Sequence, residues 1–203
     1  MRLYACSTNP GKLKEFALAA KKCGREDLTI EALPGLQSIV PPQETGSTFE
    51  ENASLKAAYY SKFCTELVLA DDSGLEVHAL ADAPGVHSAR FAGPGASKAA
   101  NNDLLLRKLE RESDRRAQFV CVIAVARSGQ VLHTARGYLE GEILRVPRGT
   151  NGFGYDPLFY YAPFECTLAE VSADRKFAVS HRGNALRATF HWLFANGESL
   201  KTR

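Results

Sequence analysis

The chain has 203 residues, of which 45% are apolar and 24% are charged, and its formal net charge is +2. This composition excludes collagen-like, low-complexity and wholly disordered chains, and the length suits a single domain over residues 1–203. The small net charge argues against a broad basic surface for nucleic acid, although a small anionic ligand can bind where the local charge differs from the mean.

Five cysteines are widely spaced, and no two of them form a CxxC pair. An odd number of cysteines without such spacing indicates neither a disulfide framework nor a zinc site, and it favours reduced thiols in a cytoplasmic protein. The N-terminal residues lack the apolar core of a signal peptide, and the longest apolar run, residues 119–126, is too short to span a membrane. We therefore expect a cytoplasmic protein without membrane contact.

The first predicted elements are a strand over residues 3–6 and a helix that follows it at once. Asn9 is a favourable N-cap, and Pro10 suits the first helical position because its missing N–H would have no partner there. A second helix is predicted from Thr48, which has the capping-box spacing to Glu51. On that helix, residues 52 and 56 are four apart and share one face.

An apolar strand over residues 67–70 is predicted to end at an Asp-Asp-Ser-Gly turn, residues 71–74, and a returning strand is predicted over residues 75–80. The further expected elements are a structured loop over residues 82–98, a helix around residues 104–109, a hairpin of residues 119–127 and 131–139, a glycine-rich loop over residues 149–156, and a last helix from Ser180 to Asn196. Alternating helices and strands with an inserted antiparallel pair favour a mixed α/β fold.

The turn over residues 7–12, Ser-Thr-Asn-Pro-Gly-Lys, is a candidate phosphate site. Free N–H groups at a helix start attract anions, the helix dipole adds to this attraction, and Lys12 supplies a positive charge. The alternative is a capped surface helix with a solvated lysine, and this turn taken alone favours that alternative.

Two adjacent carboxylates, Asp71 and Asp72, follow an apolar strand. Their mutual repulsion is relieved by a cation, and Mg²⁺ prefers such oxygen ligands together with substrate phosphates. One of the two can also orient and deprotonate a water molecule. An acidic β-turn explains the pair equally well. Glu44 can add a metal carboxylate and Lys56 a phosphate contact, although each taken singly is a plain surface charge.

The glycine-rich loop and the segment after it carry candidates for recognising a planar ring. Glycines let the backbone approach a ligand closely, Phe153 can stack on a base, and Asp156 can accept from a ring N–H. His181 and Arg182 fall in the first turn of a helix, where the macrodipole opposes their charge and an anionic or carbonyl ligand would compensate. The alternatives are a glycine-rich turn with a tucked aromatic ring and a solvent-facing helix start.

Six segments occur together and in a fixed order, namely STNPGK, ETGSTFEENASLKA, ADDSGLEV, APGVHSARFAG, GFGYDP and SHRGNAL. In this combination the chain resembles the RdgB/HAM1 family, the inosine triphosphate pyrophosphatases, also called XTP/dITP diphosphatases. The resemblance covers the chain from Ser7 to Arg182. Each segment is weakly specific alone, whereas the set is highly specific.

The resemblance implies a mixed α/β fold with two lobes around a long mixed β-sheet, flanking helices and a nucleotide cleft between the lobes. It also implies a homodimer. The implied reaction uses Mg²⁺ and hydrolyses a purine nucleoside triphosphate to the monophosphate and pyrophosphate. The implied substrates are the non-standard nucleotides ITP, dITP and XTP, whose removal cleans the nucleotide pool.

The family's functional residues can be placed on matching positions of this sequence. The triphosphate would be held by Lys56 and by the turn comprising Ser7, Thr8, Asn9, Pro10, Gly11 and Lys12. Asp72 would be the general base and a metal ligand, with Asp71 and Glu44 supporting the magnesium ion and Ser73 contacting the substrate. The base pocket would comprise Phe153, Gly154, Tyr155, Asp156, Lys176, His181 and Arg182, the last three recognising the oxo edge of the purine.

Three other functions fit parts of the pattern. The related Maf-type nucleotide pyrophosphatases act on modified pyrimidine or standard nucleotides, but the SHR and GFGYDP segments argue against that family. A nucleotide-binding regulator without catalysis would have little need for the adjacent carboxylates. A single-stranded nucleic-acid binder is disfavoured by the near-neutral net charge.

Overall fold

The computed structural model describes residues 1–25, 27–197 and 200. The chain forms two compact units, and each unit is assembled from segments that are separate in the sequence. The first unit comprises Met1–Asp72, Cys121–Gly137 and Arg182–Arg203, and the second unit comprises Ser73–Val120 and Tyr138–His181.

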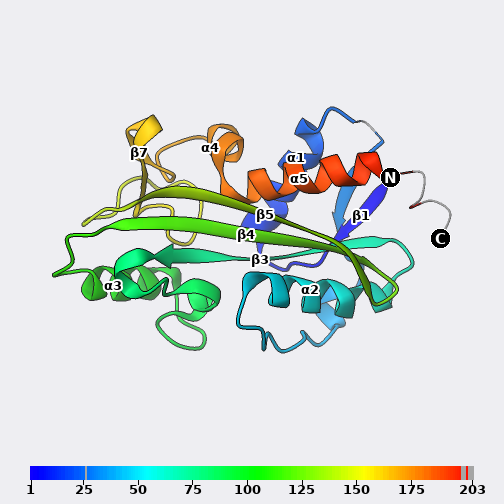
Figure 1. The fold of residues 1–203 in the computed structure, drawn as a ribbon, viewed down its shortest axis with the longest axis horizontal. Coiled ribbons are helices and arrows are strands. Elements are labelled where there is room, and N and C mark those ends of the chain that lie inside the picture. Colours follow the sequence, from blue (N-terminus) through cyan, green and yellow to red (C-terminus); the bar gives the residue numbers. More distant parts are fainter. Residues whose placement is uncertain (26, 198–199, 201–203) are drawn as a thin grey trace. The chain divides into compact units, whose positions relative to one another are not determined.

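Among the described residues, seven strands form one sheet in the order β2-β1-β3-β4-β5-β6-β7 (Figure 1). In the first unit, β1 (Arg2–Ala5) lies between β2 (Thr29–Ala32) and β3 (Leu67–Val77), and both neighbours run parallel to it. In the second unit, β6 (Phe159–Tyr161) pairs antiparallel with the end of β5 (Gln130–Ile143). The presence of parallel and antiparallel pairs in one sheet confirms the predicted mixed α/β fold.

The first unit contains α1 (Pro10–Lys22), α2 (Phe49–Tyr60) and, from its second residue onward, α5 (His181–Ala195). The predicted capping box at the start of α2 is confirmed. The hydroxyl of Thr48 accepts from the backbone N–H of Glu51 at 3.1 Å, and the carboxylate of Glu51 accepts from the backbone N–H of Thr48 at 3.2 Å. This reciprocal pair fixes where α2 begins and hence which of its residues face β3.

The predicted turn at residues 71–74 is wrong, and so is the returning strand over residues 75–80. Strand β3 continues without a break from Leu67 to Val77, and a 3-10 helix (His78–Leu80) follows it. Nearly all of its side chains are buried, so packing on both faces overrides the local turn preference of Asp, Ser and Gly. The two aspartates therefore lie inside a strand and not at the carboxyl end of one.

The second unit has its own apolar core, to which β3, α3 (Lys98–Lys108), β4 (Arg116–Arg127) and β5 contribute. The fully buried side chains of this core include Leu75, Leu105, Leu109, Leu158 and Phe159. The predicted third helix begins earlier than its apolar residues indicate because the hydroxyl of Ser97 accepts from the N–H of Ala100 at 3.1 Å.

The remaining elements are short. The second unit also holds β7 (Cys166–Thr167) and α4 (Ala173–Val179), which the sequence does not predict, and β2 of the first unit is likewise unpredicted. The hairpin predicted between β4 and β5 is confirmed, with Ser128 and Gly129 at positive φ in its two-residue turn. Further 3-10 helices occupy Leu36–Ser38, Ser61–Phe63, Gly85–Arg90 and Ala162–Phe164.

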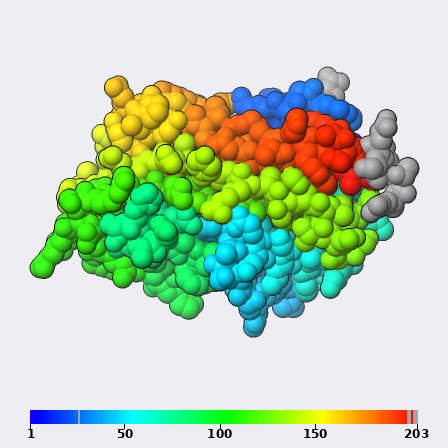
Figure 2. All heavy atoms as spheres, in the orientation of Figure 1, coloured from blue at the N-terminus to red at the C-terminus, as the bar shows by residue number. Residues whose placement is uncertain are grey.

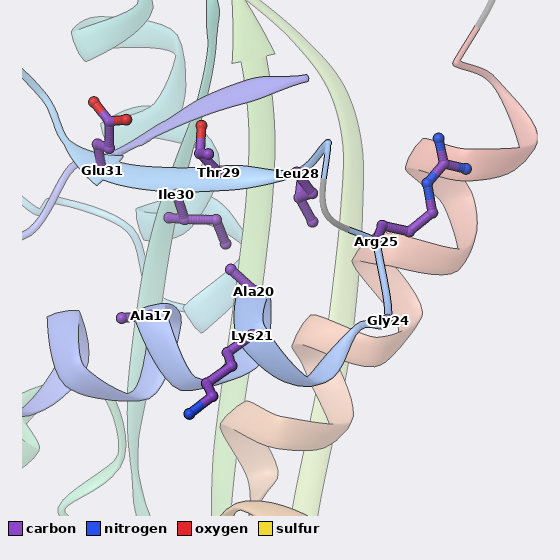
Figure 3. Close-up of a pocket in the computed structure, with 9 residues that line it drawn as sticks. All are labelled: Ala17, Ala20, Lys21, Gly24, Arg25, Leu28, Thr29, Ile30 and Glu31. Carbon is purple, nitrogen blue, oxygen red and sulfur yellow. The ribbon is translucent and has the colours of Figure 1, made fainter.

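Helix α5 forms part of the surface drawn in Figure 2, with Arg187 and His191 on its exposed side and Leu186 and Leu193 buried. A surface hollow of about 690 Å³ lies between α1 and β2 in the first unit (Figure 3). No residue predicted to bind substrate or metal lines this hollow. Among the residues that the structure describes, no helix combines the length and the apolar character needed to cross a membrane.

Replacing Thr48 with alanine removes the hydroxyl that accepts from Glu51 at the start of α2. We expect Thr48→Ala to lower the free energy of unfolding by about 0.5–2 kcal/mol, as measured by chemical denaturation. The exposed Thr65, which caps no helix, provides the control variant Thr65→Ala, for which we expect little change. An unchanged denaturation midpoint for Thr48→Ala would show that the capping box contributes nothing to stability.

The pKa of Glu51 lies below its ordinary value because its carboxylate accepts from the backbone N–H of Ser47, the hydroxyl of Ser47 and the backbone N–H of Thr48. The stabilisation by ionised Glu51 is thus complete above its ordinary pKa and is lost as the pH falls through the depressed pKa. Between about pH 6 and pH 3, the thermal midpoint of Glu51→Gln should therefore fall less than that of the wild type. Parallel melting curves over this range would contradict this expectation.

Candidate active site

Asp71 and Asp72 are consecutive residues of β3, and consecutive side chains of a strand point to opposite faces of its sheet. Their partners accordingly come from different helices. Asp71 contacts Lys12 of α1 and Arg182 of α5, whereas Asp72 contacts Lys56 of α2. Figure 1 shows α2 on the opposite side of β3 from α1 and α5. The two carboxylates therefore belong to two charged clusters with different ion-pair partners. The clusters still act on one another, because the charge of Lys56 acts to lower the pKa of Asp71 and that of Lys12 acts to lower the pKa of Asp72.

We call the first of these the α1–α5 cluster, which comprises Lys12, Glu15, Asp71 and Arg182. Oδ2 of Asp71 lies 3.0 Å from Nζ of Lys12 and accepts from Nε and Nη2 of Arg182 at 3.1 and 3.0 Å. Nη1 of Arg182 donates to Glu15, so this buried guanidinium is held by two carboxylates. Two positive charges face two negative charges, and the cluster is internally neutral.

Asp71 and Arg182 stay charged because they face one another. Burial alone would raise the pKa of Asp71, but the charges of Lys12, Arg182 and Lys56 hold it well below its ordinary value. Burial alone would lower the pKa of Arg182, but Asp71 and Glu15 raise it. The cluster is thus a fixed ion pair network that ties α1 and α5 to β3.

We call the second the α2 cluster, which comprises Glu44, Asn52, Lys56 and Asp72. Nζ of Lys56 lies 3.0 Å from Oδ1 of Asp72 and 3.1 Å from Oε1 of Glu44. Nδ2 of Asn52 donates to Oδ2 of Asp72 at 3.3 Å. Burial raises the pKa of Asp72 in spite of the opposing charge of Lys56. A carboxylate whose pKa is raised is a stronger proton acceptor, which suits it to take a proton from water.

The α2 cluster contains two carboxylates and one ammonium group, a composition that suits a divalent cation. Within the described residues, no group of three or more His, Cys, Asp or Glu side chains could hold a metal ion by itself. Mg²⁺ commonly takes one or two carboxylates and completes its shell with water and substrate phosphates, so Glu44 and Asp72 fit it chemically. Asp71 forms ion pairs with Lys12 and Arg182.

The turn before α1 is a capped helix start, as predicted. Oδ1 of Asn9 accepts from the backbone N–H groups of Gly11 and Lys12 at 2.9 and 3.3 Å, and the hydroxyl of Ser7 accepts from the N–H of Asn9 at 3.2 Å. Pro10 occupies the first helical position, and Thr8 is exposed. The positive charge of Lys12 is directed to Asp71, at the N-terminal end of α1.

In the second unit, the glycine-rich loop is organised around a buried ion pair. Oδ2 of Asp156 accepts from the backbone N–H of Phe153 at 2.7 Å and from Nζ of Lys176 at 2.6 Å. Gly152 has a φ of +72°, and a Cβ atom there would lie 2.1 Å from Oδ2 of Asp156. Only glycine fits at this position. The loop therefore packs against the carboxylate of Asp156, which also fixes the backbone of Phe153.

The ring of Phe153 lies beneath two ammonium groups, Nζ of Lys176 at 4.7 Å and Nζ of Lys98 at 5.6 Å. Nδ2 of Asn102 donates to the carbonyl of Gly154 at 3.3 Å. A half-buried aromatic ring beside buried polar groups and backbone carbonyls has the composition of a site for a planar ring.

The other residues assigned to the base pocket have structural contacts within the second unit. Tyr155 is part of the apolar core, and its hydroxyl donates to the carbonyl of Ser88 at 2.9 Å. The buried imidazole of His181 stacks on Phe119 with ring centroids 4.7 Å apart. Ser73 is a half-buried residue of β3.

Four residues of the two clusters and of the surroundings of Phe153 were not singled out as binding residues from the sequence: Glu15, Asn52, Lys98 and Asn102. Glu15 and Lys12 are three residues apart on α1, and Asn52 and Lys56 are four apart on α2, so helical spacing is the signal that could have found both. Lys98 and Asn102 are far in sequence from Phe153, and the loop conformation that brings them together has no local sequence signal.

Comparisons with known proteins agree with the motif pattern. A sequence model of the Ham1 family matches residues 3–192. The dITP/XTP pyrophosphatase of Acidobacterium capsulatum is 51% identical over 197 residues, which cover 92% of this chain and 95% of that one. The solved Ham1 protein of Staphylococcus aureus has a TM-score of 0.84 and 40% identity, covering 97% of this chain and 100% of that one. The dITP/XTP pyrophosphatase structure from Mycobacterium abscessus has a TM-score of 0.72 and 39% identity, with coverage of 93% and 97%.

Replacing Lys176 with methionine leaves Asp156 buried without its counter-charge. We expect Lys176→Met to lower the free energy of unfolding by about 3–5 kcal/mol, measured by chemical denaturation. The double variant Asp156→Asn/Lys176→Met should recover much of this loss because neither side chain of this pair is then charged. Losses that simply add in a double-mutant cycle would show that the two residues are not coupled.

Proposed function

Because this chain belongs to the Ham1 family, we propose that it is a nucleoside triphosphate pyrophosphohydrolase acting on the non-canonical purine nucleotides ITP, dITP and XTP. The products are the nucleoside monophosphate and pyrophosphate. Relatives of this chain carry the name dITP/XTP pyrophosphatase at identities near half of the aligned residues. The observation that carries the proposal is the α2 cluster, in which a buried carboxylate of raised pKa lies beside a lysine and a second carboxylate.

Asp72 is the proposed general base. Its carboxylate accepts a proton from the water molecule that attacks the α-phosphorus, and burial favours its protonated form. Lys56 then stabilises the negative charge that develops on the phosphate oxygens, with Lys12 and the turn of residues 7–12 at the start of α1 as further anion-binding groups. A magnesium ion bound by Glu44 and Asp72 would neutralise phosphate charge and lower the pKa of a bound water molecule.

Asp71 has a different proposed role from the one that the resemblance implies. Its Oδ2 atom contacts both Lys12 and Arg182, so we assign it to holding these two cations in place. Removal of either cation would take away part of the counter-charge of a buried carboxylate, which is destabilising.

The purine base is assigned to the glycine-rich loop of the second unit and to Lys176 and His181 of the same unit, whereas the buried guanidinium of Arg182 is held by Asp71 and Glu15 in the first unit. Phe153 supplies a face for stacking, and Lys176 holds the loop through Asp156. The 6-oxo group of hypoxanthine and xanthine accepts hydrogen bonds, whereas the 6-amino group of adenine donates them. Donors aimed at this position therefore lose their partners with ATP, and unpaired buried donors are costly enough for strong rejection.

We further propose that the protein is a cytoplasmic homodimer. The cysteines Cys6, Cys23, Cys64, Cys121 and Cys166 are free thiols, which suits a reducing compartment. Exposed apolar side chains of the first unit, Val40 and Phe63, are candidates for an interface between two copies. Sedimentation equilibrium measures the oligomeric state directly.

The first test is pyrophosphate release from ITP, XTP, dITP, GTP and ATP, measured side by side with magnesium. We expect strong turnover of the first three nucleotides, loss of turnover with a chelator, and little turnover of ATP. Equal turnover of all five nucleotides would support the proposed hydrolase activity but contradict the proposed recognition of the purine base. Preference for UTP or TTP would indicate a Maf-type activity, and binding of ITP without release of pyrophosphate would indicate a regulator.

Replacing Asp72 with asparagine keeps the shape of the side chain and removes the proton acceptor. We expect Asp72→Asn to lower kcat by about 100-fold or more with little change in the affinity for ITP, measured by steady-state kinetics and by nucleotide binding. Asp114→Asn serves as a control because Asp114 is a half-buried residue whose carboxylate pairs with the exposed Arg116, away from the α2 cluster in the sequence. Near-normal turnover by Asp72→Asn would remove Asp72 from the base role.

A further inference from the structure

Asn52 is fully buried on α2, and its side-chain amide has three hydrogen bonds. Oδ1 accepts from the backbone N–H of Gly46 at 2.8 Å. Nδ2 donates to the carbonyl of Gly46 at 3.3 Å and to Oδ2 of Asp72 at 3.3 Å. Both N–H groups and the carbonyl oxygen of the amide are therefore used.

The orientation of this amide is fixed by the backbone of Gly46. The N–H of Gly46 can only donate and its carbonyl can only accept, so the oxygen of Asn52 must face the former and the nitrogen must face the latter. The second N–H of Nδ2 is thereby aimed at Asp72. Asn52 consequently presents a donor to the carboxylate in a direction that the loop determines.

Only glycine, which has no Cβ atom, allows this contact at position 46. A Cβ atom at this position would lie 2.7 Å from Oδ1 of Asn52 and 2.6 Å from Cβ of Glu51. The loop backbone thus packs directly on the start of α2. Because Glu44 is two residues before Gly46, the bonds to Asn52 also restrict where Glu44 can lie.

Asn52 and Lys56 are one helical turn apart, and together they hold both oxygens of Asp72. Lys56 binds Oδ1 and also Glu44, while Asn52 binds Oδ2 and also Gly46. We propose that Asn52 is a positioning residue for catalysis, which fixes the carboxylate of Asp72 relative to the loop that carries Glu44. This inference rests on the proposed hydrolase function and adds to it a residue that acts through Asp72.

The positioning role predicts a loss in kcat larger than any change in KM. A displacement of a reacting group by about 1 Å can cost on the order of 100-fold in rate, whereas phosphate binding by the lysines is retained. We expect Asn52→Leu, which removes all three hydrogen bonds, to lower kcat for ITP by about 10–100-fold while KM changes by less than about 3-fold.

Asn52→Asp separates the two functions of the amide. A carboxylate at this position still accepts from the N–H of Gly46 but has no N–H to donate to Asp72 or to the carbonyl of Gly46, and it repels the carboxylate of Asp72. We expect the Gly46 amide to stay protected from hydrogen exchange in Asn52→Asp and to lose protection in Asn52→Leu, as measured by NMR without metal or nucleotide. Both variants should have lowered kcat.

Asn101 of the second unit provides a matched control for the loss of a buried asparagine. It is also buried, its Oδ1 accepts from the N–H of Ala92 at 2.8 Å, and its Nδ2 donates to the carbonyl of Ala89 at 3.1 Å. Asn101→Leu should lower the melting temperature as Asn52→Leu does, yet leave kcat within about 3-fold of the wild type when both are assayed well below their melting temperatures.

The outcomes separate this inference from the proposed function. An active wild type with equally active Asn52→Leu and Asn52→Asp overturns the positioning role alone. A KM that rises in both variants at unchanged kcat also overturns it, because the residue would then act in binding. No pyrophosphate release by the wild type overturns the proposed function and this inference with it. If Asn52→Leu does not fold, the kcat of the near-isosteric Asn52→Asp decides the question.

Discussion

Alternation of side chains along one strand is the constraint on which the chemistry of the first unit depends. Asp71 and Asp72 are neighbours in the chain, but β3 directs them to opposite faces of the sheet, where different helices supply their partners. One face becomes neutral because its two carboxylates are matched by a lysine and an arginine. On the other face, Glu44 and Asp72 both pair with Lys56. The same strand therefore carries one carboxylate that pairs with Lys12 and Arg182 and one that pairs with Lys56.

Burial raises the free-energy cost of leaving any of these charges without a counter-charge. Arg182 and Lys176 are both almost inaccessible to water, and each is retained by carboxylates that would themselves be costly to bury alone. Such pairs contribute more to the uniqueness of an arrangement than to its net stability, since only one geometry satisfies every charge. In the second unit this geometry sets the shape of the loop around Phe153. In the first unit it sets the relation of α1 and α5 to β3.

Local sequence signals predicted the helix starts correctly, because Asn9 and Thr48 cap through bonds to residues two or three positions away. The motif pattern was also sufficient for the family. The sequence failed at Asp71-Asp72-Ser73-Gly74, whose composition favours a turn while the packing on both faces of the sheet enforces a strand. The partners of Arg182 could not be predicted from local sequence either, because its bond to Asp71 joins residues 111 positions apart. The assignment of Asp72, Lys56 and Phe153 to substrate remains a prediction.

The arrangement of the two units has a consequence for how the chain is made. The chain passes between the units within β3, β4 and β5 and at the start of α5, so neither unit is a continuous stretch of sequence. During synthesis, Asp71 emerges 111 residues before the arginine that balances it. At ordinary elongation rates this interval is on the order of 5–20 s. Throughout that time the N-terminal third of the nascent chain holds a carboxylate that it cannot bury with its full set of counter-charges. The first unit can therefore complete its fold only after α5 has been synthesised.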